Sequence, residues 1–195
     1  MAKNSGLTKP GVTHNREDRP SSDFYPTPEH ITEALLQRER FPGTVWEPAC
    51  GEGDMSKVIE RHGYRVRSSD LFDHGYGAAG IDFTEATDLE GTQSVITNPP
   101  FKLAEEFIAS CLRLDVPKFA MFQRLGFLEG KGRYNRIFRD HPPTRIWVFS
   151  GRVTLAPKDG GKGRQSGGFM AFAWYVWDGY GGGTQRTEIG WIEPC

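Results

Sequence analysis

The chain has 195 residues, which is enough for one domain with its own hydrophobic core. With 37% hydrophobic residues and a formal net charge of −1, it lacks both the apolar run of a membrane span and the overall charge of a strongly basic nucleic-acid-binding protein. The three cysteines are too widely spaced for a disulfide framework or a metal-binding cluster, so we expect a soluble, cytoplasmic protein without a metal.

The chain begins with a polar segment and then enters a region of regular patterns. Residues 1–22 have almost no apolar periodicity, which predicts a flexible N-terminal arm before a single domain over residues 23–195. Thr27 and Pro28 are typical of a helix start, with Thr27 as the N-cap and Pro28 as the first helical residue. The helix should end before the Phe-Pro-Gly sequence at residues 41–43.

Short apolar runs then alternate with helical patterns. We predict strands at residues 44–47, 65–70, 94–98, 118–122 and 145–149, and helices at 55–62, 104–114 and 130–139. A mobile loop is expected near 152–169, followed by a last strand at 171–177. This alternation predicts an α/β fold with a mostly parallel, doubly wound sheet. Trp147, Trp174 and Trp177 lie inside strand patterns, so we expect them in the core.

Residues 47–53 form a glycine-bearing turn directly after the first predicted strand. In an open parallel sheet, ligands bind at the carboxyl ends of the strands, and glycines there allow the backbone to approach a ligand closely. The turn lacks the glycine spacing of a dinucleotide-binding fingerprint and the lysine of a P-loop. Glu47 would repel a pyrophosphate but suits a cofactor that carries an amine and a sulfonium. An ordinary tight turn between strand and helix would show the same residues.

Two aspartates follow in positions that suit further contacts to such a cofactor. Asp70 ends the second predicted strand, about 20 residues after the glycines, where a carboxylate typically holds two ribose hydroxyls. Asp82 can accept a hydrogen bond from an adenine amino group, and Phe83 can offer a ring face. Asp70 would also suit a helix cap or a turn, and a loop with a buried aromatic explains the Ile81-Asp82-Phe83 sequence better than a ligand site does.

A rigid turn follows the third predicted strand. The adjacent Pro99 and Pro100 restrict the backbone and remove two hydrogen-bond donors, which leaves the Pro99 carbonyl and the Asn98 side chain as neighbouring acceptors. Two such acceptors can hold the hydrogens of a base amino group and localise the nitrogen lone pair for attack on an activated methyl group. Phe101 offers a face on which a flipped base can stack. A turn that is only structural, with a core phenylalanine, would have the same sequence.

In their order and spacing these segments resemble the amino-methyltransferase family, and specifically the DNA adenine-N6 methyltransferases of small phages and prophages. The sequence Phe-Tyr-Pro-Thr-Pro at residues 24–28 matches the upstream cofactor-contact motif of that family. Residues 47–53 match its motif I, Asp70 motif II, residues 82–83 motif III, and Asn-Pro-Pro-Phe at 98–101 the catalytic motif IV. Residues 124–131, 143–153 and 171–178 also look like segments of these small enzymes. Asparagine at position 98 favours adenine over cytosine as the target.

The resemblance implies a Rossmann-like class I methyltransferase fold, with a seven-stranded, mostly parallel sheet and one antiparallel strand near the C-terminus. It implies S-adenosylmethionine as the cofactor and the N6 amino group of a flipped-out adenine in DNA as the methyl acceptor. Asn98 and Pro99 would hold the target amino group, and Phe101 would stack on the base beside Pro100. The implied cofactor-binding residues are Tyr25, Pro26, Thr27, Glu47, Pro48, Ala49, Cys50, Gly51, Gly53, Asp70, Leu71, Asp82, Phe83 and Asn98. Cys50 has no evident base beside it, so no covalent intermediate is expected.

The chain departs from the larger members of that family because it has almost no room for a separate target-recognition domain. We therefore expect short or relaxed sequence specificity, in a monomer or weak dimer. Six basic residues are candidates for phosphate contacts, although for any single one a solvated face is the more common explanation: Lys131, Arg133, Arg136, Lys158, Lys162 and Arg164. The same catalytic turn would also serve an RNA adenine or guanine or a protein glutamine. A catalytically silent nucleic-acid-binding module is a further alternative.

Overall fold

The computed structural model describes residues 26–155, 170–179 and 186–193. Within these residues the chain forms a seven-stranded sheet in the order β2-β1-β3-β4-β6-β5-β7. β6 is antiparallel to both β4 and β5, whereas every other neighbouring pair is parallel. This confirms the predicted α/β fold with one antiparallel strand near the C-terminus. The strands are β1 (Val45–Glu47), β2 (Val66–Ser68), β3 (Ser94–Thr97), β4 (Lys118–Arg124), β5 (Arg145–Phe149), β6 (Phe172–Asp178) and β7 (Glu188–Ile192).

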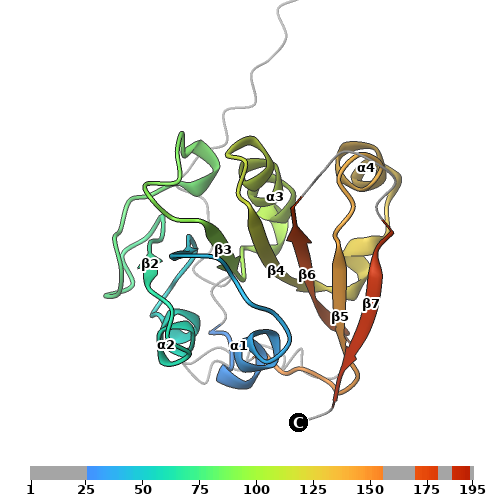
Figure 1. The fold of residues 1–195 in the computed structure, drawn as a ribbon, viewed down its shortest axis with the longest axis horizontal. Helices are drawn as coiled ribbons and strands as arrows, with labels where there is room; N and C mark the ends of the chain where they lie inside the picture. Colours follow the sequence, from blue (N-terminus) through green and yellow to red (C-terminus); the bar gives the residue numbers. More distant parts are fainter. Residues whose placement is uncertain (1–25, 156–169, 180–185, 194–195) are drawn as a thin grey trace, which may run out of the picture.

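Helices cover both faces of the sheet (Figure 1). α1 (Glu29–Leu36) and α2 (Asp54–Arg61) pack on one face, and α3 (Ala104–Arg113) packs on the other. α4 (Lys131–Arg133) continues as a π-helical turn over Tyr134–Phe138, so the predicted helix at 130–139 is present in irregular form. Short 3-10 turns occupy Phe83–Glu85, Phe101–Leu103 and Leu125–Leu128.

The central strands are buried on both faces, and their side chains alternate between two core layers. Along β4, Phe119 and Met121 face the layer under α3, whereas Phe122 faces the layer under α1 and α2. Trp174 and Trp177 on β6 are at most 1% exposed, which confirms their predicted place in the core. This period-two alternation is what a strand between two helical layers requires.

The sequence patterns assign no strand to β7, which pairs in parallel with β5 at the edge of the sheet. The strand is short, carries a glycine at its centre and exposes Ile189 and Trp191, so it has no buried apolar run. A Cβ at Gly190 would lie 2.2 Å from the Trp147 ring. Glycine is therefore needed here to accommodate a side chain of the neighbouring strand, which a local pattern cannot reveal.

A buried ion-pair cluster ties the elements together at the amino ends of β4 and β5. The Glu39 carboxylate accepts hydrogen bonds from Lys118 Nζ at 2.7 Å, Arg145 Nε at 2.6 Å and Trp147 Nε1 at 2.8 Å. Asp178 at the end of β6 pairs with the same two cations. Two acidic and two basic groups thus compensate one another. The cluster lies at the opposite end of the strands from the carboxyl ends of β1, β3 and β4.

Candidate active site

The strand order reverses between β1 and β3. From β1 the chain proceeds to β2 on one side, while β3 and β4 lie on the other, so the turns after β1 and β3 flank a topological switch point. These turns carry residues 47–53 and 98–101, the two strongest motifs in the sequence. The structure therefore brings together segments that are about 50 residues apart at the position where open α/β sheets bind their ligands.

Glu47 ends β1 and is 2% exposed. Its carboxylate accepts a hydrogen bond from the Ser56 hydroxyl of α2, which also lies 2.6 Å from the Ser68 hydroxyl at the end of β2. Burial raises the pKa of Glu47 well above its ordinary value, and the hydrogen bond from Ser56 opposes part of that rise. A buried acidic group is thus held under the turn by neighbours from two other elements.

The turn after β1 is held tightly against the loop that follows β2. Gly51 and Gly53 have φ values of 51° and 80°, which favour glycine, and a Cβ on Gly53 would lie 2.4 Å from the Tyr76 ring. Gly53 was expected to contact the cofactor, but its immediate neighbour is this ring. Cys50 is 4% exposed, and burial raises the pKa of its thiol to about 12, so it is not a thiolate nucleophile.

Asp70 links the two loops. One carboxylate oxygen accepts from the backbone N–H of Gly51 at 3.0 Å, and the other accepts from the N–H of Phe72 at 3.0 Å. His74 Nε2 lies 3.9 Å from the second oxygen. Each carboxylate oxygen has a further lone pair, so Asp70 can still accept hydrogen bonds from a ligand. The turn role and the ligand role that the sequence left open are therefore compatible.

Asp82 and Phe83 both have close contacts within the protein. Asp82 caps a short 3-10 turn, accepting from the Thr84 backbone at 3.0 Å and from the Thr84 hydroxyl at 2.6 Å. The Phe83 ring is 1% exposed and packs edge-on against Trp46, with centroids 4.9 Å apart. This burial fits the alternative of a loop anchored by a core aromatic and leaves no open ring face on Phe83.

The turn after β3 presents two hydrogen-bond acceptors. Asn98 Nδ2 donates to Thr27 Oγ1 at 3.1 Å, which orients the amide and directs Oδ1 away from this bond. Among the described residues, no donor reaches Asn98 Oδ1 or the Pro99 carbonyl, whereas the Pro100 carbonyl accepts from the Leu103 N–H at 2.8 Å. The pair of acceptors expected from the sequence is therefore available.

Thr27 does not act as the helix cap that the sequence predicted. α1 begins at Glu29, its N-cap is Pro28, and no side-chain hydrogen bond caps it. The Thr27 side chain is instead 6% exposed and serves Asn98. A bond between residues 71 positions apart has no local sequence signal, which is why this role was missed.

Phe101 is half-buried, and its ring already has neighbours. The Arg124 guanidinium at the end of β4 lies 4.6 Å from the ring centroid, and the Phe172 ring lies 6.0 Å away. Arg124 is exposed, and the sequence assigned it no role of its own within the segment 124–131. Stacking of Phe101 on a target base stays a prediction, and it requires the guanidinium to move or to join the stack.

The basic residues predicted to contact phosphates differ in their surroundings. Arg133 donates to the backbone carbonyls of Phe127 and Glu129, both at 2.6 Å, and to Glu105 at 3.2 Å, so it braces the turn after β4. Arg136 also pairs with Glu105. Lys131 is exposed. Of the remaining expectations, Tyr25, Lys158, Lys162 and Arg164, the arm at 1–22 and most of the loop at 152–169 lie outside the described residues.

Two further features of the described residues bear on the predicted partners. No group of three or more His, Cys, Asp or Glu side chains is placed to hold a metal ion within this part of the chain. In the same ranges, no helix is both long and apolar enough to cross a membrane.

The fold is shared with proteins of known structure, although their sequences are not similar to this one. No family model matches the chain, and no curated protein of similar sequence is found. Protein 1320 of Thermoplasma acidophilum superposes with a TM-score of 0.51 at 11% identity, over 78% of this chain and 97% of that one. The 23S rRNA methyltransferase ErmE superposes with a TM-score of 0.50 at 13% identity, over 78% of this chain and 68% of that one. At these identities the likeness establishes the Rossmann-like fold alone.

Proposed function

We propose that the chain is an S-adenosylmethionine-dependent methyltransferase that modifies the exocyclic amino group of a nucleic-acid base, namely the N6 group of adenine in DNA. The observation that carries this proposal is the turn at residues 98–101. Its two available acceptors, Asn98 Oδ1 and the Pro99 carbonyl, lie at the switch point of the sheet beside the turn after β1. The fold held in common with a methyltransferase of known structure supports the same class of reaction.

The residues present fit the proposed cofactor. Asp70 keeps free lone pairs for ribose hydroxyls while its bonds to Gly51 and Phe72 hold the carboxylate in place. Glu47 lies under the same turn, but its burial raises the pKa of its carboxyl group and favours the neutral form, which weakens the attraction to a positively charged ligand that the sequence suggested. When bound, S-adenosylmethionine supplies a methyl group that is activated by attachment to a sulfonium sulfur.

The protein's part in the reaction is to hold the attacking nitrogen. Asn98 Oδ1 and the Pro99 carbonyl accept the two N–H bonds of the target amino group, which turns its lone pair out of conjugation with the ring. With S-adenosylmethionine held by Asp70 and the turn after β1, the sulfonium would supply the methyl group to this nitrogen, and one amino proton would leave to solvent. Because the sulfonium already activates the methyl group, the proposed transfer is direct, without a metal or a covalent enzyme intermediate.

The choice of DNA adenine rests on the resemblance of the motifs, and the test must separate it from RNA and protein substrates. Purified protein is incubated with tritiated S-adenosylmethionine and with DNA, tRNA, rRNA or bulk protein, and the modified residue is identified by mass spectrometry. We expect N6-methyladenine in DNA. Methylation of RNA or of protein glutamine alone would replace the substrate but leave the reaction class intact.

Two variants test the roles of the site residues. Asn98→Ala should reduce methyl transfer by about 100-fold or more, because it removes one of the two acceptors. Incorporation that persists unchanged in this variant would favour a silent binding module with a contaminating activity. Asp70→Ala should weaken S-adenosylmethionine binding by about tenfold in calorimetry. Asp73→Ala is the matched control, since Asp73 is an exposed residue of the same loop that also accepts a backbone N–H.

A further inference from the structure

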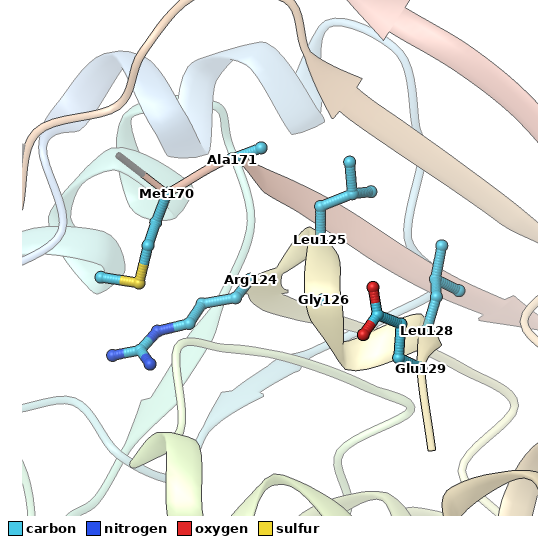
Figure 2. A pocket seen from close by; sticks show the side chains of 7 residues that line it. All are labelled: Arg124, Leu125, Gly126, Leu128, Glu129, Met170 and Ala171. Carbon is cyan, nitrogen blue, oxygen red and sulfur yellow. The ribbon is translucent and has the colours of Figure 1, made fainter. Parts of the chain in front are cut away.

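An open pocket of about 540 Å³ lies at the carboxyl end of β4, next to the proposed target site (Figure 2). One wall is the turn that follows β4, with Leu125, Gly126 and Leu128, and the opposite side is formed by Met170 and Ala171, which immediately precede β6. Arg124 belongs both to this lining and to the ring contact with Phe101. The pocket therefore adjoins the catalytic turn without including Asn98 or Pro99.

Two opposite charges line an otherwise apolar space. Figure 2 shows the Arg124 side chain extending below Met170 on one side and the Glu129 carboxylate beside Leu128 on the other. Both residues are exposed, and within the described ranges neither forms an ion pair or a side-chain hydrogen bond. The Glu129 carboxylate and the N–H groups of the Arg124 guanidinium, whose central carbon lies over the Phe101 ring, are thus available to a ligand, while the leucine and methionine side chains can contact a flat ring.

The wall of the pocket is held rigidly in place. Arg133 donates to the carbonyls of Phe127 and Glu129 and is itself anchored by Glu105. The Tyr175 hydroxyl donates toward the carbonyls of Arg124 at 3.1 Å and Leu125 at 3.2 Å. The Leu125 N–H donates to the Ala171 carbonyl at 2.8 Å, which ties the two sides of the pocket together. A braced backbone of this kind suits a binding site rather than a passive surface loop.

We infer that this pocket binds the nucleotide adjacent to the methylated base and prefers guanine there, an inference that rests on the proposed function. A guanine outside a base pair offers the acceptors O6 and N7, which an arginine contacts in bidentate fashion, and the donors N1–H and N2–H, from which a carboxylate accepts. Adenine, cytosine and thymine each lack either the two neighbouring acceptors or the two neighbouring donors. The volume falls within the range of small-ligand pockets.

The experiment measures kcat/KM for methyl transfer to DNA oligonucleotides that hold one adenine, with each of the four bases in turn on its 5′ or 3′ side. We expect the full chain to prefer guanine on one side by about tenfold. Inosine, which lacks the N2 amino group, should lose most of this preference. Glu129→Ala should abolish the difference between guanine and inosine and leave transfer to the other flanking bases unchanged.

The control variant is Glu106→Ala, which removes an exposed carboxylate of α3 that does not line the pocket. It should keep the preference for guanine. Three results would overturn the inference and leave the proposed function standing. The wild-type chain could transfer methyl groups equally well with all flanking bases, or the preference for guanine could survive Glu129→Ala. The third result is a decrease in kcat/KM in Glu129→Ala that is the same for every flanking base. If the wild-type chain methylates none of the DNA or matching RNA oligonucleotides, the proposed function fails, and the inference fails with it.

Discussion

Replacing Thr27 with valine tests whether the hydrogen bond to Asn98 decides how well the site holds an amino group. The Thr27 hydroxyl accepts from Asn98 Nδ2 at 3.1 Å, and this leaves Oδ1 as the acceptor for the substrate. Valine has nearly the same shape as threonine but no hydroxyl. In Thr27→Val the productive orientation of the amide loses this hydrogen bond, so the amide is no longer held in it and the orientation rotated by 180° becomes more populated.

The expected magnitude follows from the cost of that unpaired donor. A fully buried donor that loses its partner costs about 1–3 kcal/mol, the lower part of this range applies to the partly buried Asn98 amide, and each 1.4 kcal/mol corresponds to about a tenfold change in population. The fraction of Asn98 side chains in the productive orientation should therefore fall by about tenfold, and kcat with it. Because the rotated amide would present a donor to the substrate amino group, it contributes no compensating activity.

The assay combines single-turnover methyl transfer with calorimetric binding of S-adenosylmethionine. Thr27→Ser keeps the hydroxyl and should retain most of the activity. Asn98→Asp supplies the decisive background, since a carboxylate presents an acceptor oxygen in either orientation. In that background, Thr27→Val should change the rate by less than about twofold.

Two results would refute this reasoning. If Thr27→Val lowers the rate equally in the Asn98 and Asn98→Asp backgrounds, then Thr27 does not act through the amide orientation. If the main effect is a weaker affinity for S-adenosylmethionine with unchanged kcat, then Thr27 serves the cofactor, as the sequence motif alone suggested.

The remaining predictions concern stability. Glu39→Gln should lower the free energy of unfolding by about 3 kcal/mol in urea titrations, because it leaves Lys118 and Arg145 undercompensated, whereas Asp140→Asn in an exposed ion pair should leave the free energy of unfolding unchanged within the error of the titration. Burial alone would raise the pKa values of Glu39 and Asp178, but their bonds to Arg145 and Lys118 hold both below their ordinary values. The stabilisation from these carboxylates is therefore present above about pH 5 and is lost as the pH falls through the lowered values, and Glu39→Gln should flatten this dependence. Gly53→Ala should cost at least about 2 kcal/mol more than Gly63→Ala, because both have positive φ but only the first would place a Cβ against Tyr76. A similar loss for both alanine variants would show that the Tyr76 contact does not constrain the turn.

Much of the fold could be predicted because its signals are local. Six of the seven strands follow from short apolar runs separated by helical patterns, and the strand at 145–149 has the predicted limits. Helices α2 and α3 begin within one residue of the predicted starts. β7 could not be predicted, because an exposed edge strand of five residues needs no continuous apolar run.

The candidate site was predictable in its motifs but not in its contacts. The sequence by itself determined the chemical groups: two acceptors beside two prolines, an acidic residue before a glycine turn, and a carboxylate after the next strand. Tertiary structure alone decided that Thr27 orients Asn98 and that Arg124 covers Phe101, whereas the burial of Phe83 agrees with the explanation that the sequence favoured. The physical reason is the separation in sequence of the residues that interact. Turns and periodic burial depend on neighbours in sequence. A hydrogen bond between residues 71 positions apart, or a guanidinium over a ring, depends on where the sheet places the ends of its strands.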